Sequence, residues 1–263
     1  MDGGSALAYE VQGGADAPTL ISGVTIGGTV ANAPAVMMRN ARTTRVGNDS
    51  PQTDAEITIE NCINNADVTA ENTNRATAFV STVFGAIMQI DSCVNNGDMT
   101  VISTTEAHAA GIAGYIMRDT NQADNPPMPM LTVTNCVNNG NISGKSTNDG
   151  RANVGGIVAT AHQGTTVVEN CVNNGTVSGE EAAQKNQTCV GGIVGRVNSA
   201  MTINGCANRG DVTATATSER AYAGGIVGMC DGAAALTMDE AAVYTGAVIS
   251  NGAAVDKPVG NQD

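Results

Sequence analysis

LTVTNCVNNGNISG, at residues 131–144, is the segment that decides the fold, because the chain repeats it four more times without a gap. The other copies are ITIENCINNADVTA (57–70), MQIDSCVNNGDMTV (88–101), TVVENCVNNGTVSG (166–179) and MTINGCANRGDVTA (201–214). Their cysteines are separated by 31, 43, 35 and 35 residues, so the period is about 35 residues with insertions. Self-similarity at such a period indicates a solenoid or another repeat architecture.

Each copy alternates apolar and polar residues, as at Leu131 and Val133, which is the period of a half-buried strand. The NNG phrase predicts a sharp corner at which a positive φ is tolerated, followed by a short second strand. A GGIV-like phrase predicts the third strand. Its copies are FGAIMQ (84–89), AGIAGYIM (110–117), VGGIVATA (154–161), VGGIVGRV (190–197) and AGGIVGMC (223–230). The predicted fold class is all-β: a right-handed parallel β-helix (β-solenoid) of about seven coils of about 35 residues, with three short strands per coil.

The repeat also predicts the domain organisation. Degenerate copies, LISGVTIGGTV (20–30) and LTMDEAAVYTGAV (236–248), stand at the ends of the series, as a capped solenoid requires. We expect a cap or irregular segment at 1–19, a single solenoid domain at 20–250, and a tail or linker at 251–263.

The amino-acid composition indicates a thin core and excludes some classes of binding partner. Trp is absent, and two Phe and four Tyr leave Ala, Val, Ile and Met to fill the interior. A net charge of −13 repels nucleic acid. The sequence has no apolar run long enough for direct membrane insertion and no signal peptide at its start, so the chain is either intracellular or a mature fragment of a longer secreted protein. A composition rich in Asn, Thr, Gly and Ala and poor in Lys favours the mature fragment, located outside the cell or on its surface.

Together, the GGIVG phrase and the following TIxxCxNxGxV phrase resemble the GLUG-type repeats of bacterial surface proteins, adhesins and some IgA-protease-like proteins. The resemblance covers residues 57–230 well and the ends poorly. It implies a β-helical stalk or adhesive segment of a larger exported protein. It assigns no catalytic residue.

Two columns of repeated side chains are predicted to be structural. The cysteines lack C-x-x-C spacing, so a zinc site is not expected, and stacked thiols should lie buried and reduced in the core. The asparagines two residues later should form an amide ladder, although a solvent-facing, ligand-binding role for them stays open. The two columns are Cys62, Cys93, Cys136, Cys171 and Cys206, and Asn64, Asn95, Asn138, Asn173 and Asn208. Cys189 and Cys230 stand outside the column, and they could pair only if the segment before Gly191 folds back.

The remaining candidate groups carry weak signals. Asp67, Asp98 and Asp211 share one repeat position and are predicted to be solvated corner residues. His108 and His162 fall in or beside variable segments and are predicted to lie on the surface. A glycosidase-type acid pair could come from Glu106 and Glu180 only if the fold brought them within about 5–9 Å. No metal ion and no cofactor are predicted.

The predicted function is a non-catalytic extracellular or cell-surface module for adhesion, ligand binding or structural spacing. Two alternatives stay open: a polysaccharide-active β-helix enzyme, and a filament subunit that associates end to end. The expected partner is a carbohydrate or a host or matrix protein. The variable segments between the second and third strands should form a ridge that, with a Pro-rich insertion at 118–130, makes the ligand contacts. The predicted contact residues are Asp119, Asn121, Asp124, Asn148, Glu180 and Lys185.

Overall fold

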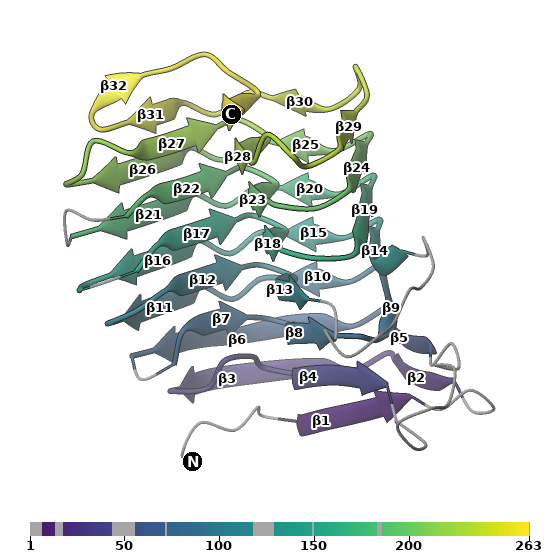
Figure 1. Cartoon of the computed structure of the whole chain (residues 1–263). Helices are drawn as coiled ribbons and strands as arrows, with labels where there is room; N and C mark the ends of the chain where they lie inside the picture. The colour runs from purple at the N-terminus through teal and green to yellow at the C-terminus, as the bar shows by residue number, and fades with distance from the viewer. Residues whose placement is uncertain are drawn as a thin grey trace, which may run out of the picture.

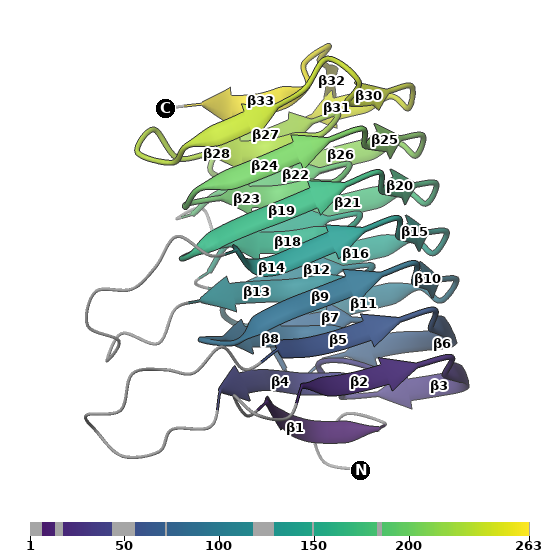
Figure 2. The same cartoon turned by 90° about the vertical axis from the view of Figure 1, so that its right-hand side faces the viewer.

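The computed structural model describes residues 7–13, 18–43, 56–71, 73–117, 129–148, 150–182 and 186–262. Within these ranges every regular element is a β-strand. The coils stack from the N terminus to the C terminus (Figure 1), and in Figure 2 the near strands rise from left to right as the chain climbs, which is the sense of a right-handed coil. The predicted all-β, right-handed parallel β-solenoid is confirmed.

Sheet 1 contains the strand that opens each coil. Inward side chains such as Ile57 and Ile59 are fully buried and alternate with outward polar ones, because successive side chains of a strand point to opposite faces. Its seven strands are β2 (Thr19–Ser22), β5 (Glu56–Glu60), β9 (Ile87–Asp91), β14 (Pro129–Thr134), β19 (Thr165–Glu169), β24 (Met201–Asn204) and β29 (Leu236–Met238).

The corner after sheet 1 differs from the predicted one. The residue before each repeated cysteine has a left-handed backbone, with φ of 53° at Asn61 and 54° at Asn135, a conformation that Asn tolerates better than most residues. The glycines of the NNG phrase do not have positive φ. A Cβ on Gly140 would instead lie 1.9 Å from the carbonyl oxygen of Gly97 in the preceding coil. Glycine is therefore needed at NNG so that neighbouring coils can approach closely.

Sheet 2 follows this corner and has 13 strands, because most coils cross it as a two-residue strand and then a longer one. Its last two strands pair antiparallel, whereas the other pairs are parallel. The strands are β3 (Thr25–Ala31), β6 (Ile63–Ala70), β10 (Val94–Asn95), β11 (Met99–Ser103), β15 (Val137–Asn138), β16 (Ile142–Ser146), β20 (Val172–Asn173), β21 (Val177–Glu181), β25 (Ala207–Asn208), β26 (Val212–Ala216), β30 (Val243–Tyr244), β31 (Val248–Ser250) and β32 (Ala253–Ala254).

The predicted third strand is divided between two sheets. Sheet 3 contains β7 (Arg75–Thr77), β12 (Ala107–Ala110), β17 (Ala152–Gly155), β22 (Thr188–Gly191) and β27 (Ala221–Gly224). Sheet 4 contains β1 (Ala8–Gly13), β4 (Met38–Thr43), β8 (Val80–Phe84), β13 (Ala113–Met117), β18 (Val158–Ala161), β23 (Val194–Val197), β28 (Val227–Cys230) and β33 (Val259–Gln262).

The GGIV phrase bends the chain between sheets 3 and 4. A Cβ on Gly155 would lie 2.0 Å from the carbonyl oxygen of Val158, so the bend in this coil needs glycine, whereas Ala110 and Thr77 stand at the same register position in the two preceding coils. A coil such as residues 87–117 consequently has five strands, β9 to β13, where three were predicted. Strand pairing also reaches past the predicted ends of the solenoid domain, since β1 pairs with β4 and β33 with β28.

A buried amide ladder joins the coils inside sheet 2. Each asparagine except the last donates from Nδ2 to Oδ1 of the asparagine one coil later, at 2.7 Å, and all five also donate to the carbonyl oxygen two residues ahead. The ladder contains the five predicted residues Asn64, Asn95, Asn138, Asn173 and Asn208. Ile26 stands beside its first member and Tyr244 beside its last, where the repeat degenerates.

The five repeat cysteines lie beneath the sheet 1 corner as buried free thiols. The Cys171 Sγ, for example, approaches the carbonyl oxygen of Glu169 at 3.3 Å and that of Val133, in the coil before, at 3.6 Å. Cys189 and Cys230 are also buried and free, so neither thiol takes part in a disulfide. Thiols at these positions act as small core side chains that link successive coils.

Candidate functional site

The predicted ligand residues fall in three different situations. Asp119, Asn121, Asp124 and Lys185 lie outside the described residues. Asn148 is exposed between β16 and β17. Glu180, on β21, forms an ion pair of 2.7 Å with Lys145 of the preceding coil, and both side chains are more than a third exposed.

Glu180 and Glu106, considered from the sequence as an acid pair, have different partners. Glu106 lies two coils earlier, just before β12, and its contacts are to His108 and Arg151. The two carboxylates therefore neutralise different cations. The aspartates that share one repeat position make backbone contacts. Exposed Asp67 and Asp98 each accept a hydrogen bond from the backbone N–H of the corner residue in the next coil, at 2.8 and 2.7 Å.

The most concentrated polar chemistry lies where sheets 3 and 4 meet, on the side that faces away from the hydrophobic core. We call this set of side chains the corner network. Its sheet 3 members, in register from coil to coil, are Arg75, His108, Asn153, Cys189 and Tyr222. Its sheet 4 members, also in register, are Thr82, Tyr115, Thr160, Arg196 and Met229.

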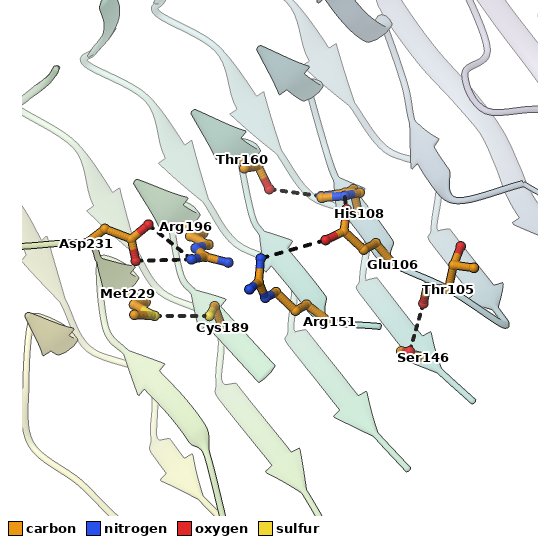
Figure 3. A network of polar contacts seen from close by, with 10 residues as sticks. All are labelled: Thr105, Glu106, His108, Ser146, Arg151, Thr160, Cys189, Arg196, Met229 and Asp231. Atoms are coloured by element: carbon orange, nitrogen blue, oxygen red, sulfur yellow. Dashed lines mark hydrogen bonds and ion pairs between the residues drawn. The ribbon is translucent and has the colours of Figure 1, made fainter. Parts of the chain in front are cut away.

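His108 is the centre of the network, and its predicted place on the surface is wrong. The residue is 1% exposed. Its Nδ1 lies 2.9 Å from Thr160 Oγ1, and its Nε2 lies 3.3 Å from Glu106 Oε2 (Figure 3). The ring also contacts Tyr115 edge-on, with centroids 4.9 Å apart, and Tyr115 stacks on His162. The close fold of sheet 3 against sheet 4 buries a side chain that would otherwise be exposed.

Burial determines the protonation of this cluster. Burial lowers the pKa of His108 below its usual value of 6.5, although Glu106 opposes the shift. The hydrogen bond from His108, helped by the charges of Arg151 and Arg196, lowers the pKa of Glu106 to about 2. A neutral imidazole satisfies both neighbours when Nε2–H donates to Glu106 and Nδ1 accepts from the Thr160 hydroxyl.

Hydroxyl, imidazole and carboxylate thus stand in the order used by nucleophilic hydrolases. Accessibility is the reverse of what that chemistry needs. Thr160 is 2% exposed, whereas the side chain of Glu106, which should be buried, is 43% exposed. A substrate cannot reach the hydroxyl in this arrangement, so the three residues link two coils.

Further along the network, Arg196 is held by a carboxylate. Its Nη2 lies 3.1 and 3.0 Å from the two oxygens of Asp231 (Figure 3), and the Arg196 side chain is only 8% exposed. Beside it, the Cys189 Sγ lies 3.7 Å from the Met229 Sδ. Burial raises the pKa of Cys189 to about 12, so this thiol is not a nucleophile at neutral pH.

A pocket of about 510 Å³ opens at the N-terminal end of the network. It is bordered by Arg75, by Arg39 of β4, and by the segments that lead from sheet 2 into sheet 3 in two successive coils. These segments, which include Thr73 and Thr105, belong to the ridge that was predicted to contact ligand. The pocket itself was not predicted.

No group of three or more His, Cys, Asp or Glu side chains is placed to hold a metal ion in the part of the chain that the structure describes. The same residues include no helix of the length and hydrophobicity needed to span a membrane.

Comparison with known proteins gave one distant structural similarity. No family model and no curated protein matches the chain. Among solved structures, it is similar to a candidate immunoglobulin A1 protease from Bacteroides ovatus, with a TM-score of 0.41 and 14% identity. The alignment covers 92% of this chain and 79% of that one. A similarity this distant carries no argument about fold or function, and the resemblance to GLUG-type repeats stays a prediction.

One signal in the sequence could have located the corner network. Its sheet 3 members all stand three residues before the second glycine of the GGIV phrase or its equivalent, as His108 does before Gly111 and Asn153 before Gly156. Its sheet 4 members stand four residues after that glycine, as Thr160 does after Gly156. The positions recur although the residue types do not.

Proposed function

We propose that the chain is a non-catalytic binding module of an exported protein, located outside the cell or on its surface. In this proposal the coils are a rigid scaffold that presents the segments between sheets 2 and 3 to a ligand. The observation that carries the proposal is the pair of amide ladders that lock each coil to the next.

The second ladder supports this reading because it is exposed and runs in the opposite sense. Asn96 Nδ2 donates back to Asn65 Oδ1, and Asn139 Nδ2 donates back to Asn96 Oδ1, each at 2.8 Å. Two columns of side-chain hydrogen bonds, one buried and one exposed, hold the coils in a fixed register. The presented segments therefore keep a fixed spacing from coil to coil, which suits recognition of an extended ligand.

The polar side chains with catalytic potential are engaged with each other. His108, Thr160 and Arg196 are buried; His108 and Thr160 contact each other, and Arg196 pairs with Asp231. Such a network stabilises the corner more readily than it turns over a substrate.

The test combines binding and turnover on one purified sample. The chain is applied to immobilised glycans and matrix proteins, and the same polysaccharides are incubated with it and assayed for new reducing ends and unsaturated products. We expect saturable binding without product. Product formation that follows the protein through purification would contradict the proposal.

A further inference from the structure

We propose that the pocket bordered by Arg39 and Arg75 binds a carboxylate-bearing sugar unit of an acidic polysaccharide. This inference rests on the proposed binding function and names the chemistry of one site within it. The volume, about 510 Å³, lies within the range of small-molecule sites and accommodates one or two sugar rings.

The guanidinium of Arg75 packs against an aromatic ring. Its guanidinium carbon lies 4.9 Å from the ring centroid of Tyr115, and Tyr115 in turn contacts His108 of the corner network. The Nη1 of Arg75 donates to the Asn74 amide oxygen at 3.3 Å. Its Nε is buried and has no hydrogen-bond partner among the described residues. A guanidinium has five N–H donors in a fixed plane. The Arg75 guanidinium therefore keeps donors that a ligand in the pocket could accept from.

Arg39 borders the same pocket from β4, one coil earlier, and has a similar support, since its guanidinium carbon lies 4.7 Å from the ring centroid of Tyr9. Burial lowers the pKa of Arg75, the charges of Tyr115 and Glu106 oppose that shift, and the charge of Arg39 adds to it. Because both guanidinium groups belong to residues that border the pocket, an anion bound there would lie near two positive charges. Guanidinium groups bind carboxylates through paired, charge-assisted hydrogen bonds.

The rest of the lining favours a sugar over a simple inorganic anion. Thr73, Ser81 and Ser103 border the pocket, and hydroxyl-bearing residues both donate and accept hydrogen bonds, as the alcohol groups of a pyranose require. Glu71, which is exposed, also borders it, and its charge opposes a second negative charge on the ligand. The net charge of −13 likewise repels densely charged polyanions. A ligand with one carboxylate and several hydroxyls fits these constraints best.

The experiment is a calorimetric titration with a glucuronate-containing disaccharide and with the same disaccharide after its carboxylate has been reduced to an alcohol. We expect the neutral form to bind at least tenfold more weakly, and the affinity for the acidic form to fall as salt is raised. Arg39→Gln and Arg75→Gln should each weaken binding of the acidic form at least tenfold.

Arg42→Gln is the matched control. Arg42 lies on the same strand as Arg39, its guanidinium is also stacked on a ring, that of Phe84, and it pairs with Glu10 at 3.6 Å, but it does not border the pocket. This variant should bind within twofold of the parent chain. If Arg75→Gln lowers the melting temperature, Arg75→Lys and Arg39→Gln supply the test, because the lysine keeps the charge and loses the planar fork.

Equal affinity for the acidic and neutral disaccharides would overturn the inference. So would full competition by sulfate at the same concentration as the disaccharide, or equal losses in Arg39→Gln and Arg42→Gln. Binding of another glycan or protein with no response to the acidic disaccharide would refute this site and leave the proposed function standing. Binding at the site followed by cleavage of the disaccharide would support this site and contradict the proposed non-catalytic function.

Discussion

The buried amide ladder should contribute far more to stability than its exposed counterpart, and Asn138 is the residue with which to measure the difference. Asn138 lies in the middle of the ladder and is fully buried. It accepts from Asn95 Nδ2 and donates to Asn173 Oδ1, both at 2.7 Å, and it donates to the carbonyl oxygen of Gly140 at 2.8 Å. Asn138→Ala removes all three hydrogen bonds without adding a group that can replace them.

The expected loss follows from these contacts. Three hydrogen bonds at about 1 kcal/mol each amount to about 3 kcal/mol. In this variant Asn173 Oδ1 loses the hydrogen bond that it accepts from Asn138 Nδ2. Burying a polar group without its partner adds about 1–2 kcal/mol to the loss of stability. We therefore expect Asn138→Ala to lower the free energy of unfolding by about 4 kcal/mol.

The control is Asn139→Ala, one residue along the chain. Asn139 donates to Asn96 and accepts from Asn174, both at 2.8 Å, but it is exposed, so water replaces its lost partners. Its expected cost is below about 1 kcal/mol. Urea unfolding followed by circular dichroism measures both variants, and an unchanged slope against urea would show that the same surface is exposed. Equal losses in the two variants would refute the assignment of the buried ladder as the principal link between coils.

Three further outcomes are expected. Cys171→Ser should cost about 1–3 kcal/mol in urea unfolding, because it buries a hydroxyl at a site shaped for a thiol; rapid reaction of the native cysteines with a thiol reagent would contradict their burial. The pKa of His108 is lowered in the folded state, so the unfolded state binds the proton more readily, and stability should fall as the pH drops below 6.5; melting curves of His108→Gln should lack that loss. Gly156→Ala should lower the free energy of unfolding by at least about 2 kcal/mol, because its methyl group would lie 2.2 Å from a backbone oxygen of the next coil. Gly27→Ala is the control and should be tolerated, because no atom lies nearer than 4.0 Å to its methyl group.

Stacking explains why much of the fold could be predicted from sequence. A side chain that bonds to its own equivalent one coil later must be the same residue in every coil, as Asn138 and Asn173 are. Such positions appear in the sequence as repeated letters. The strands of sheet 1, the cysteine column and the buried ladder were therefore visible without coordinates.

The corners could not be predicted in the same way, because a repeated glycine has more than one possible cause. Gly140 repeats because the backbone of the preceding coil leaves no room for a Cβ, whereas the left-handed corner belongs to Asn135. The same ambiguity concealed the bend at Gly155, which divides one predicted strand between two sheets. Only the register between coils separates conformational freedom from close approach.

In the corner network the positions recur from coil to coil but the residue types do not. The occupants on sheet 3 change from Arg75 to His108, Asn153 and Cys189. Arg75, His108 and Cys189 contact side chains of sheet 4 across the corner and not their own equivalents. Positions that are buried in register but free of the stacking requirement can vary without loss of the fold. At the N-terminal end of this series the occupant is a guanidinium whose Nε has no described partner and whose neighbours frame an open pocket. A solenoid of this kind can therefore gain a binding site by changing a few residues beside the GGIV bend, while the ladders on the other sheets maintain the scaffold.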